Sequence, residues 1–273
     1  METIVLLHCS GSSGAQWRAL ASRLGSRYRV IAPDLIGYGA AAGWSGGGEF
    51  SLAHEAAAVR SLLGRLDEPA HLVGHSYGGA VALHLARMRP ELLRSLALVE
   101  PSAFHLLRNG DATDAAALRE IMAVAADARA ALAVGNYSGG FGRFVDYWSG
   151  PGSWEEMPPE KRAAFVPQLA KVVLDFHALL AEPAELEDVR DIALPTLLVQ
   201  GGGTTLPSRC VCARLRTALP QAAFRVVPGA GHMLPITHRD PVNALIDAHL
   251  EASSSSPFAA RPAGTREPAA LTV

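Results

Sequence analysis

The stretch GHSYGG at residues 74–79 decides the fold because of the segments on either side of it. It follows the apolar run AHLV at residues 70–73 and precedes AVALHLA at residues 80–86, which indicates a helix. A strand, a sharp turn with a serine and a helix are typical of a nucleophile elbow, whose glycines permit a strained backbone and close helix–strand contact. Ser76 would stand exposed above a sheet, at a helix N-terminus that favours negative charge. The alternative is a glycine-rich turn with an incidental serine.

The composition is that of a globular protein with one large core, or one core and an added lobe. Of the 273 residues, 49% are hydrophobic and 18% are charged. A formal net charge of −2, without a lysine-arginine cluster, indicates that nucleic acid is not a partner. We find no signal sequence at the amino terminus and expect no membrane association, which predicts a cytoplasmic protein and leaves its oligomeric state open.

The three cysteines do not suggest a disulfide or a metal site. Cys210 and Cys212 are separated by one residue, have no histidine cluster beside them, and leave Cys9 without a partner if they pair. Free thiols in a reducing cytosol are the expected state, and no metal ion is expected.

Short aliphatic or β-branched runs alternate with longer alanine-rich stretches along most of the chain. This alternation predicts a mostly parallel α/β sheet of about six strands with helices on both faces. Strands are expected near residues 4–8, 28–32, 70–74, 95–99, 196–200 and 224–227. Helices are expected near residues 17–24, 52–66, 79–89, 208–218 and 241–250, the last capped by Asp240 with Pro241 in its first turn.

A long segment without a convincing strand interrupts this alternation between residues 101 and 194. It contains two helical stretches, residues 114–134 and 159–180, joined by the aromatic, glycine-rich residues 137–154. Its place after a strand's carboxyl end predicts a lid over the edge where such sheets bind ligands, although the helices could also extend the core. The resulting division is a core of residues 1–100 and 192–251, a helical cap of residues 101–191 and a disordered tail of residues 252–273.

Three further segments accompany the elbow at residues 74–79, in the order LLHCSGSSG at residues 6–14, PDLIGYG at residues 33–39 and PGAGHM at residues 228–233. With these four segments the chain resembles the α/β-hydrolase family over about residues 4–250. The resemblance implies that the first segment is an oxyanion loop and that the last carries a catalytic base. The amino-terminal hairpin common in that family is missing, so the strand near residues 28–32 is expected at a sheet edge.

The family resemblance assigns the nucleophile to Ser76 and the base to His232. A serine hydroxyl is a poor nucleophile until a base removes its proton, and an imidazole can do this near neutral pH. His232 follows the final strand, so the fold can bring it back over Ser76. His238 is the alternative, although it stands beside a helix cap rather than in a glycine-rich loop. Other histidines within or beside the strand and helix segments are interpreted as structural, namely His8, His71, His75 and His84.

An oxyanion formed at the attacked carbonyl needs hydrogen-bond donors that are already in place. The backbone N–H of Tyr77, which follows the nucleophile, and that of Ser10, in the loop after the first strand, are expected to provide them. The Ser10 hydroxyl is a possible third donor. Cys9 stands where the family usually has a glycine, which affects the conformation of this loop.

The third catalytic position departs from the common family pattern. The family's acid often follows the strand that corresponds to residues 196–200, but residues 192–239 contain no Asp or Glu and the relevant stretch reads GGGTTL. Some members carry the acid at the end of the preceding strand, where this chain has Glu100. The order Ser76, Glu100, His232 fits the family. Glu100 is therefore the expected acid, with a purely structural residue as the alternative.

These residues predict a serine hydrolase that needs no cofactor and cleaves a small carboxylic ester through an acyl-enzyme. Thioesters and lactones remain open as substrates. The oxyanion loop also resembles that of enzymes that split carbon–carbon bonds of diketone acids, which need basic groups for the substrate acid. The basic candidates in the predicted cap are Arg108, Arg119, Arg129 and Arg143. A third possibility is a hydrolase-like binding protein without activity, because fold does not guarantee function.

Overall fold

The computed structural model describes residues 1–255 and contains one sheet of six parallel strands in the order β2-β1-β3-β4-β5-β6. The predicted sheet is confirmed, and β2 lies at its edge as expected. The strand order reverses between β1 and β3, where loops diverge and ligands typically bind. The strands are β1 (Thr3–Leu7), β2 (Arg29–Ile31), β3 (Ala70–His75), β4 (Leu93–Val99), β5 (Thr196–Gly201) and β6 (Ala223–Val227).

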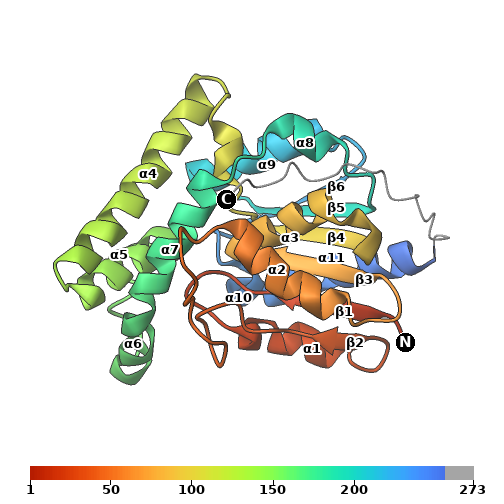
Figure 1. Cartoon of the computed structure of the whole chain (residues 1–273), viewed down its shortest axis with the longest axis horizontal. Coiled ribbons are helices and arrows are strands. Elements are labelled where there is room, and N and C mark those ends of the chain that lie inside the picture. Colours follow the sequence, from red (N-terminus) through yellow and green to blue (C-terminus); the bar gives the residue numbers. More distant parts are fainter. Residues whose placement is uncertain (256–273) are drawn as a thin grey trace.

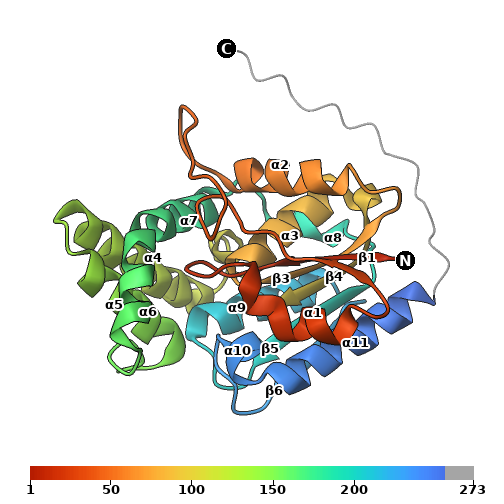
Figure 2. The same cartoon turned by 90° about the horizontal axis from the view of Figure 1, so that it is seen from below.

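The sheet is apolar on both faces, because successive side chains of each strand alternate between two cores. In β1, Val5 and Leu7 belong to the larger core, whereas Ile4 and Leu6 belong to the smaller one. Figure 2 shows α2 and α3 on one side of the sheet and α1 and α11 on the other. The surrounding helices are α1 (Arg18–Leu24), α2 (Leu52–Leu63), α3 (Tyr77–Met88), α8 (Leu186–Arg190), α9 (Leu206–Ala218), α10 (Leu234–Thr237) and α11 (Arg239–Ser254).

Five α-helices lie between β4 and β5, and the first four of them gather at one end of the molecule (Figure 1). These four are α4 (Ala112–Ala133), α5 (Tyr137–Ser149), α6 (Pro159–Phe165) and α7 (Leu169–Ala181), and we call them the inserted helices. A short 3-10 turn, Val166–Gln168, separates α6 from α7 at Pro167, which lacks a backbone N–H to continue the first helix.

The segment of residues 137–154, expected to be a connection, is largely the helix α5. The Asn136 side chain accepts a hydrogen bond from Gly139 N–H and caps this helix. Phe141, Phe144 and Trp148 follow at spacings of three and four residues, so they share one helix face. The glycines of this segment suggested a loop, although the spacing of the aromatic residues is that of a helix.

By length and composition alone, residues Pro159–Ala181 could cross a membrane, whereas the sequence led us to expect no membrane association. The stretch is divided by the 3-10 turn, and 39% of its most apolar window is buried inside the protein. It also carries the buried ion pair between Lys171 and Asp175. One such stretch is weak support for a membrane span, because core helices of soluble proteins share its composition.

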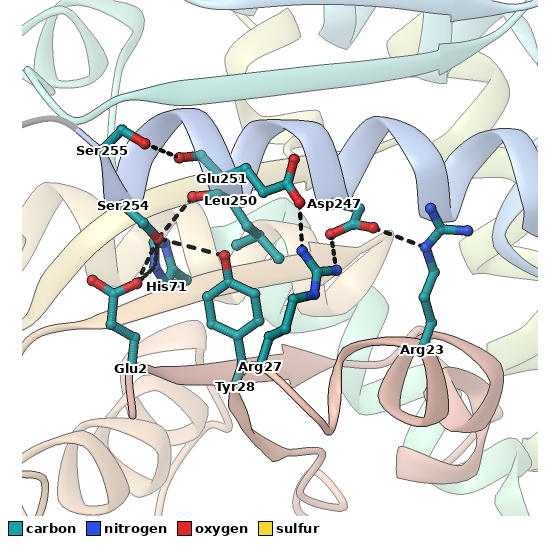
Figure 3. A network of polar contacts seen from close by, with 10 residues as sticks. All are labelled: Glu2, Arg23, Arg27, Tyr28, His71, Asp247, Leu250, Glu251, Ser254 and Ser255. Carbon is teal, nitrogen blue, oxygen red and sulfur yellow. Dashed lines mark hydrogen bonds and ion pairs between the residues drawn. The ribbon is translucent and has the colours of Figure 1, made fainter.

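The carboxyl-terminal helix α11 is anchored by polar contacts to α1, to the turn between α1 and β2, and to Glu2 before β1 (Figure 3). Asp247 accepts hydrogen bonds from Arg23, at 2.9 Å, and from Arg27, at 2.5 Å. Ser254 Oγ donates to Glu2 Oε2 over 2.5 Å. The helix therefore extends through Ser254, into the segment expected to be a disordered tail from residue 252; residues 256–273 of that prediction lie outside the described residues.

The start of α11 also differs from the expected cap. The helix begins at Arg239 and the residue in its N-cap position is His238, so Asp240 lies within the first turn. An acidic side chain there still interacts favourably with the positive end of the helix dipole.

Candidate active site

Ser76 occupies a strained turn between β3 and α3. Its backbone angles are φ 55° and ψ −117°, a left-handed φ that side chains other than glycine rarely adopt. Close packing explains two of the glycines. A Cβ on Gly78 would lie 2.5 Å from the His8 carbonyl oxygen, and one on Gly74 would lie 2.3 Å from that of Gly78. The turn is held where β1, β3 and α3 meet, because Gly78 N–H donates to the His8 carbonyl over 3.1 Å.

The structure brings Ser76, His232 and Glu100 into one hydrogen-bonded chain. His232 Nε2 lies 2.9 Å from Ser76 Oγ, and His232 Nδ1 lies 2.9 Å from Glu100 Oε2. The three side chains come from the elbow after β3, the loop after β6 and the end of β4. All are buried, with Ser76 7%, His232 2% and Glu100 0% exposed.

Glu100 is held by donors from the neighbouring β5 loop. Its φ of 47° makes it, with Ser76, one of two described non-glycine residues with a positive φ. Gly201 N–H donates to Oε1 over 2.7 Å, and Thr204 Oγ1 donates to Oε2 over 2.5 Å. Backbone strain at both residues indicates that the surrounding structure imposes these orientations, as it does at many functional sites.

Neighbouring rings and hydroxyls fix the position of His232. Ser208 Oγ lies 3.1 Å from Nδ1, and the Trp148 ring packs on the imidazole with centroids 4.0 Å apart. His75 Nε2 lies 2.9 Å from the His232 carbonyl oxygen, to which it donates. Burial, reinforced by the nearby His232, holds the pKa of His75 well below its ordinary value, so His75 is neutral.

Of the two expected oxyanion donors, Tyr77 is the first residue of α3, directly after Ser76, and Ser10 lies in the loop after β1. The backbone N–H groups of Ser10 and Tyr77 donate no hydrogen bond to another described residue. The Ser10 hydroxyl does not serve as the expected third donor, because it donates instead to Asp175 Oδ2 over 2.5 Å. Cys9 keeps this loop in place through its own N–H, which donates to Gln16 Oε1 over 3.1 Å.

The space beside Ser76 is small and mostly apolar. Its free volume is about 10 Å³, roughly that of one water molecule. Ser76 was expected to be exposed, but side chains of the inserted helices cover it. The lining consists of Ser10, Ser76, Ser102, Phe104, Phe144, Trp148, Asp175, Phe176 and Leu179.

No basic side chain lines this pocket. Arg119, Arg129 and Arg143 are exposed on α4 and α5, and Arg129 borders a separate groove between α4 and α7. Arg108 donates to the backbone carbonyl of Glu182. The one charged residue on the wall is Asp175, whose side chain is acidic and buried.

The other histidines have different neighbours. The rival base, His238, is partly exposed and contacts Thr237 Oγ1. His8 Nε2 accepts from Leu35 N–H over 3.0 Å. His71 contacts Ser95, and His84 contacts Glu182. None of these four is hydrogen-bonded to Ser76 within the part of the chain that the structure describes.

Four residues of the site were not predicted from the sequence, namely Ser102, Trp148, Asp175 and Ser208. Ser102 Oγ lies 3.1 Å from Ser76 Oγ. Serines after a strand, such as Ser102, or in the first turn of a helix, such as Ser208 in α9, are too common to be singled out. The aromatic spacing of α5 could have suggested that Trp148 faces the core. Asp175 lies one turn after Lys171 in the mostly apolar α7, and such a pair of charges was a usable signal.

The three cysteines are buried free thiols in the structure. Burial raises the pKa of Cys9 to about 12, so its thiol is protonated at neutral pH. Among residues 1–255, no group of three or more His, Cys, Asp or Glu side chains could hold a metal ion.

Comparison with known proteins places the chain in a family. Residues 4–245 match the alpha/beta hydrolase family, and the chain belongs to it. A Synechocystis relative named provisionally as a non-heme chloroperoxidase is 30% identical over 90% of each chain. A pimeloyl-[acyl-carrier protein] methyl ester esterase of Aeromonas hydrophila is 42% identical over 39% of this chain and 40% of that enzyme.

Solved structures agree with the fold. The MenH structure from S. aureus has a TM-score of 0.75 at 19% identity and covers 93% of this chain and 95% of that one. Est816, described as degrading N-acyl homoserine lactones, has a TM-score of 0.68 at 22% identity over 91% of this chain and 93% of that one. The chain is thus an alpha/beta hydrolase, in a family that includes esterases.

Proposed function

We propose that this protein is a serine hydrolase that cleaves a small carboxylic ester, with Ser76 as nucleophile, His232 as base and Glu100 as acid. The observation that carries the proposal is the pair of 2.9 Å contacts that His232 makes, one from each ring nitrogen, to Ser76 and Glu100. Such an arrangement matches the geometric roles of a catalytic triad, which is recognised by geometry rather than by sequence position.

In the acylation half of this reaction, His232 Nε2 takes the Ser76 hydroxyl proton as Oγ attacks the ester carbonyl carbon. The negative charge then on the carbonyl oxygen is stabilised by the N–H groups of Ser10 and Tyr77. The carbon–oxygen ester bond breaks, and His232 returns the proton to the leaving alcohol. The acyl group stays on Ser76 Oγ.

In the second half, water takes the place of the alcohol. His232 removes a proton from it, the resulting hydroxide attacks the acyl carbon, and the proton returns to Ser76 Oγ as the carboxylic acid leaves. Glu100 takes up no proton in this scheme. It accepts a hydrogen bond from Nδ1–H, which leaves Nε2 free to act as the base, and it stabilises the imidazolium.

The inserted helices, within residues 101–191, are proposed to act as a cap over this site, with residues 1–100 and 192–251 as the core. About 10 Å³ of space does not hold an ester, so α5 and α7 must shift or their side chains Phe144, Trp148 and Phe176 must turn to admit one. The apolar wall favours an uncharged acyl or alcohol group.

The lining disfavours the two other functions. A diketone acid needs a basic partner for its carboxylate, and the pocket offers Asp175 instead. A binding protein without activity does not need a serine in a strained turn beside a histidine–carboxylate pair. Thioesters and lactones remain compatible with the site. The buried free thiols support a reducing compartment such as the cytoplasm.

Covalent labelling tests the proposal. A fluorophosphonate should react with Ser76 and stop the hydrolysis of short-chain p-nitrophenyl esters, with one label for each active site. Ser76→Ala should lose both labelling and turnover while keeping its melting temperature. Labelling that persists in Ser76→Ala, or a wild-type protein without esterase activity, would reject the assignment.

A further inference from the structure

The side chains of the two proposed oxyanion-hole residues end on two different buried acids. Ser10 Oγ donates to Asp175 Oδ2 over 2.5 Å, and Tyr77 OH donates to Glu55 Oε2 over 3.1 Å. Asp175 is on α7, one of the inserted helices, whereas Glu55 is on α2 of the core. The two acids are fully or almost fully buried, at 1% and 0% exposed.

One lysine joins the two acids. Lys171, one turn before Asp175 on α7, is hydrogen-bonded to Asp175 Oδ1 and lies 3.3 Å from Glu55 Oε2. Its ammonium also lies 4.8, 4.7 and 4.6 Å from the ring centroids of Tyr38, Phe50 and Tyr77. At 6% exposed, this cation has little contact with water. Carboxylates and aromatic faces replace that water.

We propose that Lys171 is a positioning residue for the oxyanion hole. Through the two acids it links the loop of Ser10 and the elbow residue Tyr77 to the inserted helix α7. This inference rests on the proposed function. It adds that the hole is set in its working geometry only while α7 is docked on the core.

The charges explain why the link depends on the lysine. Burial raises the pKa of Glu55, and the nearby Lys171 counteracts that rise, so the lysine favours the ionised, hydrogen-bond-accepting carboxylate. Without the ammonium, two buried carboxylates would face each other unpaired. Glu55 Oε1 also accepts from Ile36 N–H over 2.8 Å, and Tyr38 OH donates to Asp175 Oδ2 over 2.5 Å. The loop after β2 is therefore held by the same two acids.

If Lys171 only stabilised the fold, its two acid partners would not need to bind Ser10 and Tyr77. Both hydroxyls belong to the residues whose backbone N–H groups are proposed to stabilise the oxyanion, and each contact fixes the side chain next to the donor. Small displacements of such donors reduce transition-state stabilisation much more than substrate binding. The expected signature is a lower kcat with little change in KM.

The test compares Lys171→Met, which keeps the length of the side chain and removes its charge, with Lys161→Met. Lys161, on α6, is exposed and is the other lysine of the chain. Fluorophosphonate titration counts the folded active sites, so kcat is expressed per site. We expect Lys171→Met to lose about 10- to 100-fold in kcat with KM within about twofold. Lys161→Met should match the wild type.

An alkylboronic acid provides a second readout, because its tetrahedral adduct on Ser76 places a charged oxygen in the hole. Its dissociation constant should rise by the same factor by which kcat/KM falls. Because Lys171→Met could fail to fold, the same measurements are made on Tyr77→Phe and Ser10→Ala. Each removes one hydroxyl and keeps the backbone N–H, and about a tenfold loss of kcat with unchanged KM is expected.

The outcomes separate the two proposals. Wild-type turnover that is lost in Ser76→Ala establishes the hydrolase. If Lys171→Met then keeps full kcat per site and full boronate affinity, the positioning role is wrong while the hydrolase stands. If Lys171→Met does not fold, full kcat and boronate affinity in Tyr77→Phe and Ser10→Ala lead to the same conclusion. A wild type with no Ser76-dependent turnover overturns both.

Discussion

Thr204 Oγ1 donates a 2.5 Å hydrogen bond to Glu100 Oε2, so the loop after β5, where the family resemblance first suggested an acid, carries a donor to the carboxylate at the end of β4. The two positions are adjacent across the parallel pair β4 and β5, where Val99 pairs with Val199. Moving the carboxylate from one loop to the other therefore keeps it within reach of His232. A carboxylate could thus contact His232 from either position, 100 or 204.

Thr204→Asp alone should lower activity, because a second buried carboxylate beside Glu100 makes ionisation of the pair unfavourable. In the Glu100→Gln background the same change should instead raise kcat above that of the single Glu100→Gln variant. Thr204→Asn, which adds the same volume without charge, is the control. Equal kcat for Glu100→Gln with and without Thr204→Asp would show that the loop cannot present a carboxylate to His232.

The pH dependence of kcat/KM should show one ionisation between acid and neutral pH, with activity rising as pH rises. Only the neutral imidazole of His232 can take the serine proton, and neighbouring His75 is already neutral because burial lowers its pKa well below the ordinary value. Initial rates with a slow ester, for which chemistry limits turnover, measure this profile. A flat profile, or two successive acid-side steps, would contradict it.

Stability should fall as pH is lowered from about 6.5 to about 4. Burial lowers the pKa of both His8 and His105 to about 4, so the folded state stays neutral in this window while the unfolded chain binds protons. Because the unfolded state holds more protons, the free energy of unfolding rises with pH there, by about 1.4 kcal/mol per pH unit for each such histidine.

Urea denaturation at several pH values measures this slope in the wild type and in His105→Gln, which removes one buried imidazole. The variant's slope should be smaller by about one proton. His177→Gln at an exposed position is the control and should keep the wild-type slope. If the free energy of unfolding of His105→Gln depends on pH as in the wild type, His105 binds its proton equally well in the folded and unfolded states.

A truncation after Ala252 should lower the melting temperature by about 4 to 8 °C relative to a truncation after Ser255. The shorter chain loses the 2.5 Å hydrogen bond from Ser254 to Glu2 and the buried Ser253, each contributing about 1 kcal/mol. The longer chain keeps the α11 contacts of Figure 3. Equal melting temperatures would show that the end of α11 contributes nothing and that a tail from residue 252, as the composition suggested, is the better description.

The sequence predicted the sheet well because strand signals in a parallel sheet are local. Each buried strand is a short aliphatic run, and the elbow motif marks where the central one ends. Glu100 was proposed as the acid because the position near Thr204 holds no carboxylate and the family resemblance allows an acid at the end of the preceding strand. Ser76 stands in a motif whose glycines the close packing of the backbone requires, and His232 follows Gly229, whose positive φ of 71° favours glycine.

The contacts of the inserted helices could not be predicted in the same way. Tyr38 and Asp175 are 137 residues apart in sequence, and their contact follows from how α7 packs on the core. The burial of Ser76 also follows from how the inserted helices pack on the core. The local sequence pattern predicts where a helix forms, but it does not predict which loop each helix face contacts.

The central claim is that Ser76, His232 and Glu100 act together, and the most direct test is kcat per active site for Glu100→Gln. The amide keeps the volume of the side chain but removes the charge that His232 Nδ1–H faces at 2.9 Å. We expect kcat to fall by about 10³- to 10⁴-fold while the protein stays folded, as judged by its melting curve. A folded Glu100→Gln enzyme with near-normal kcat would contradict the account.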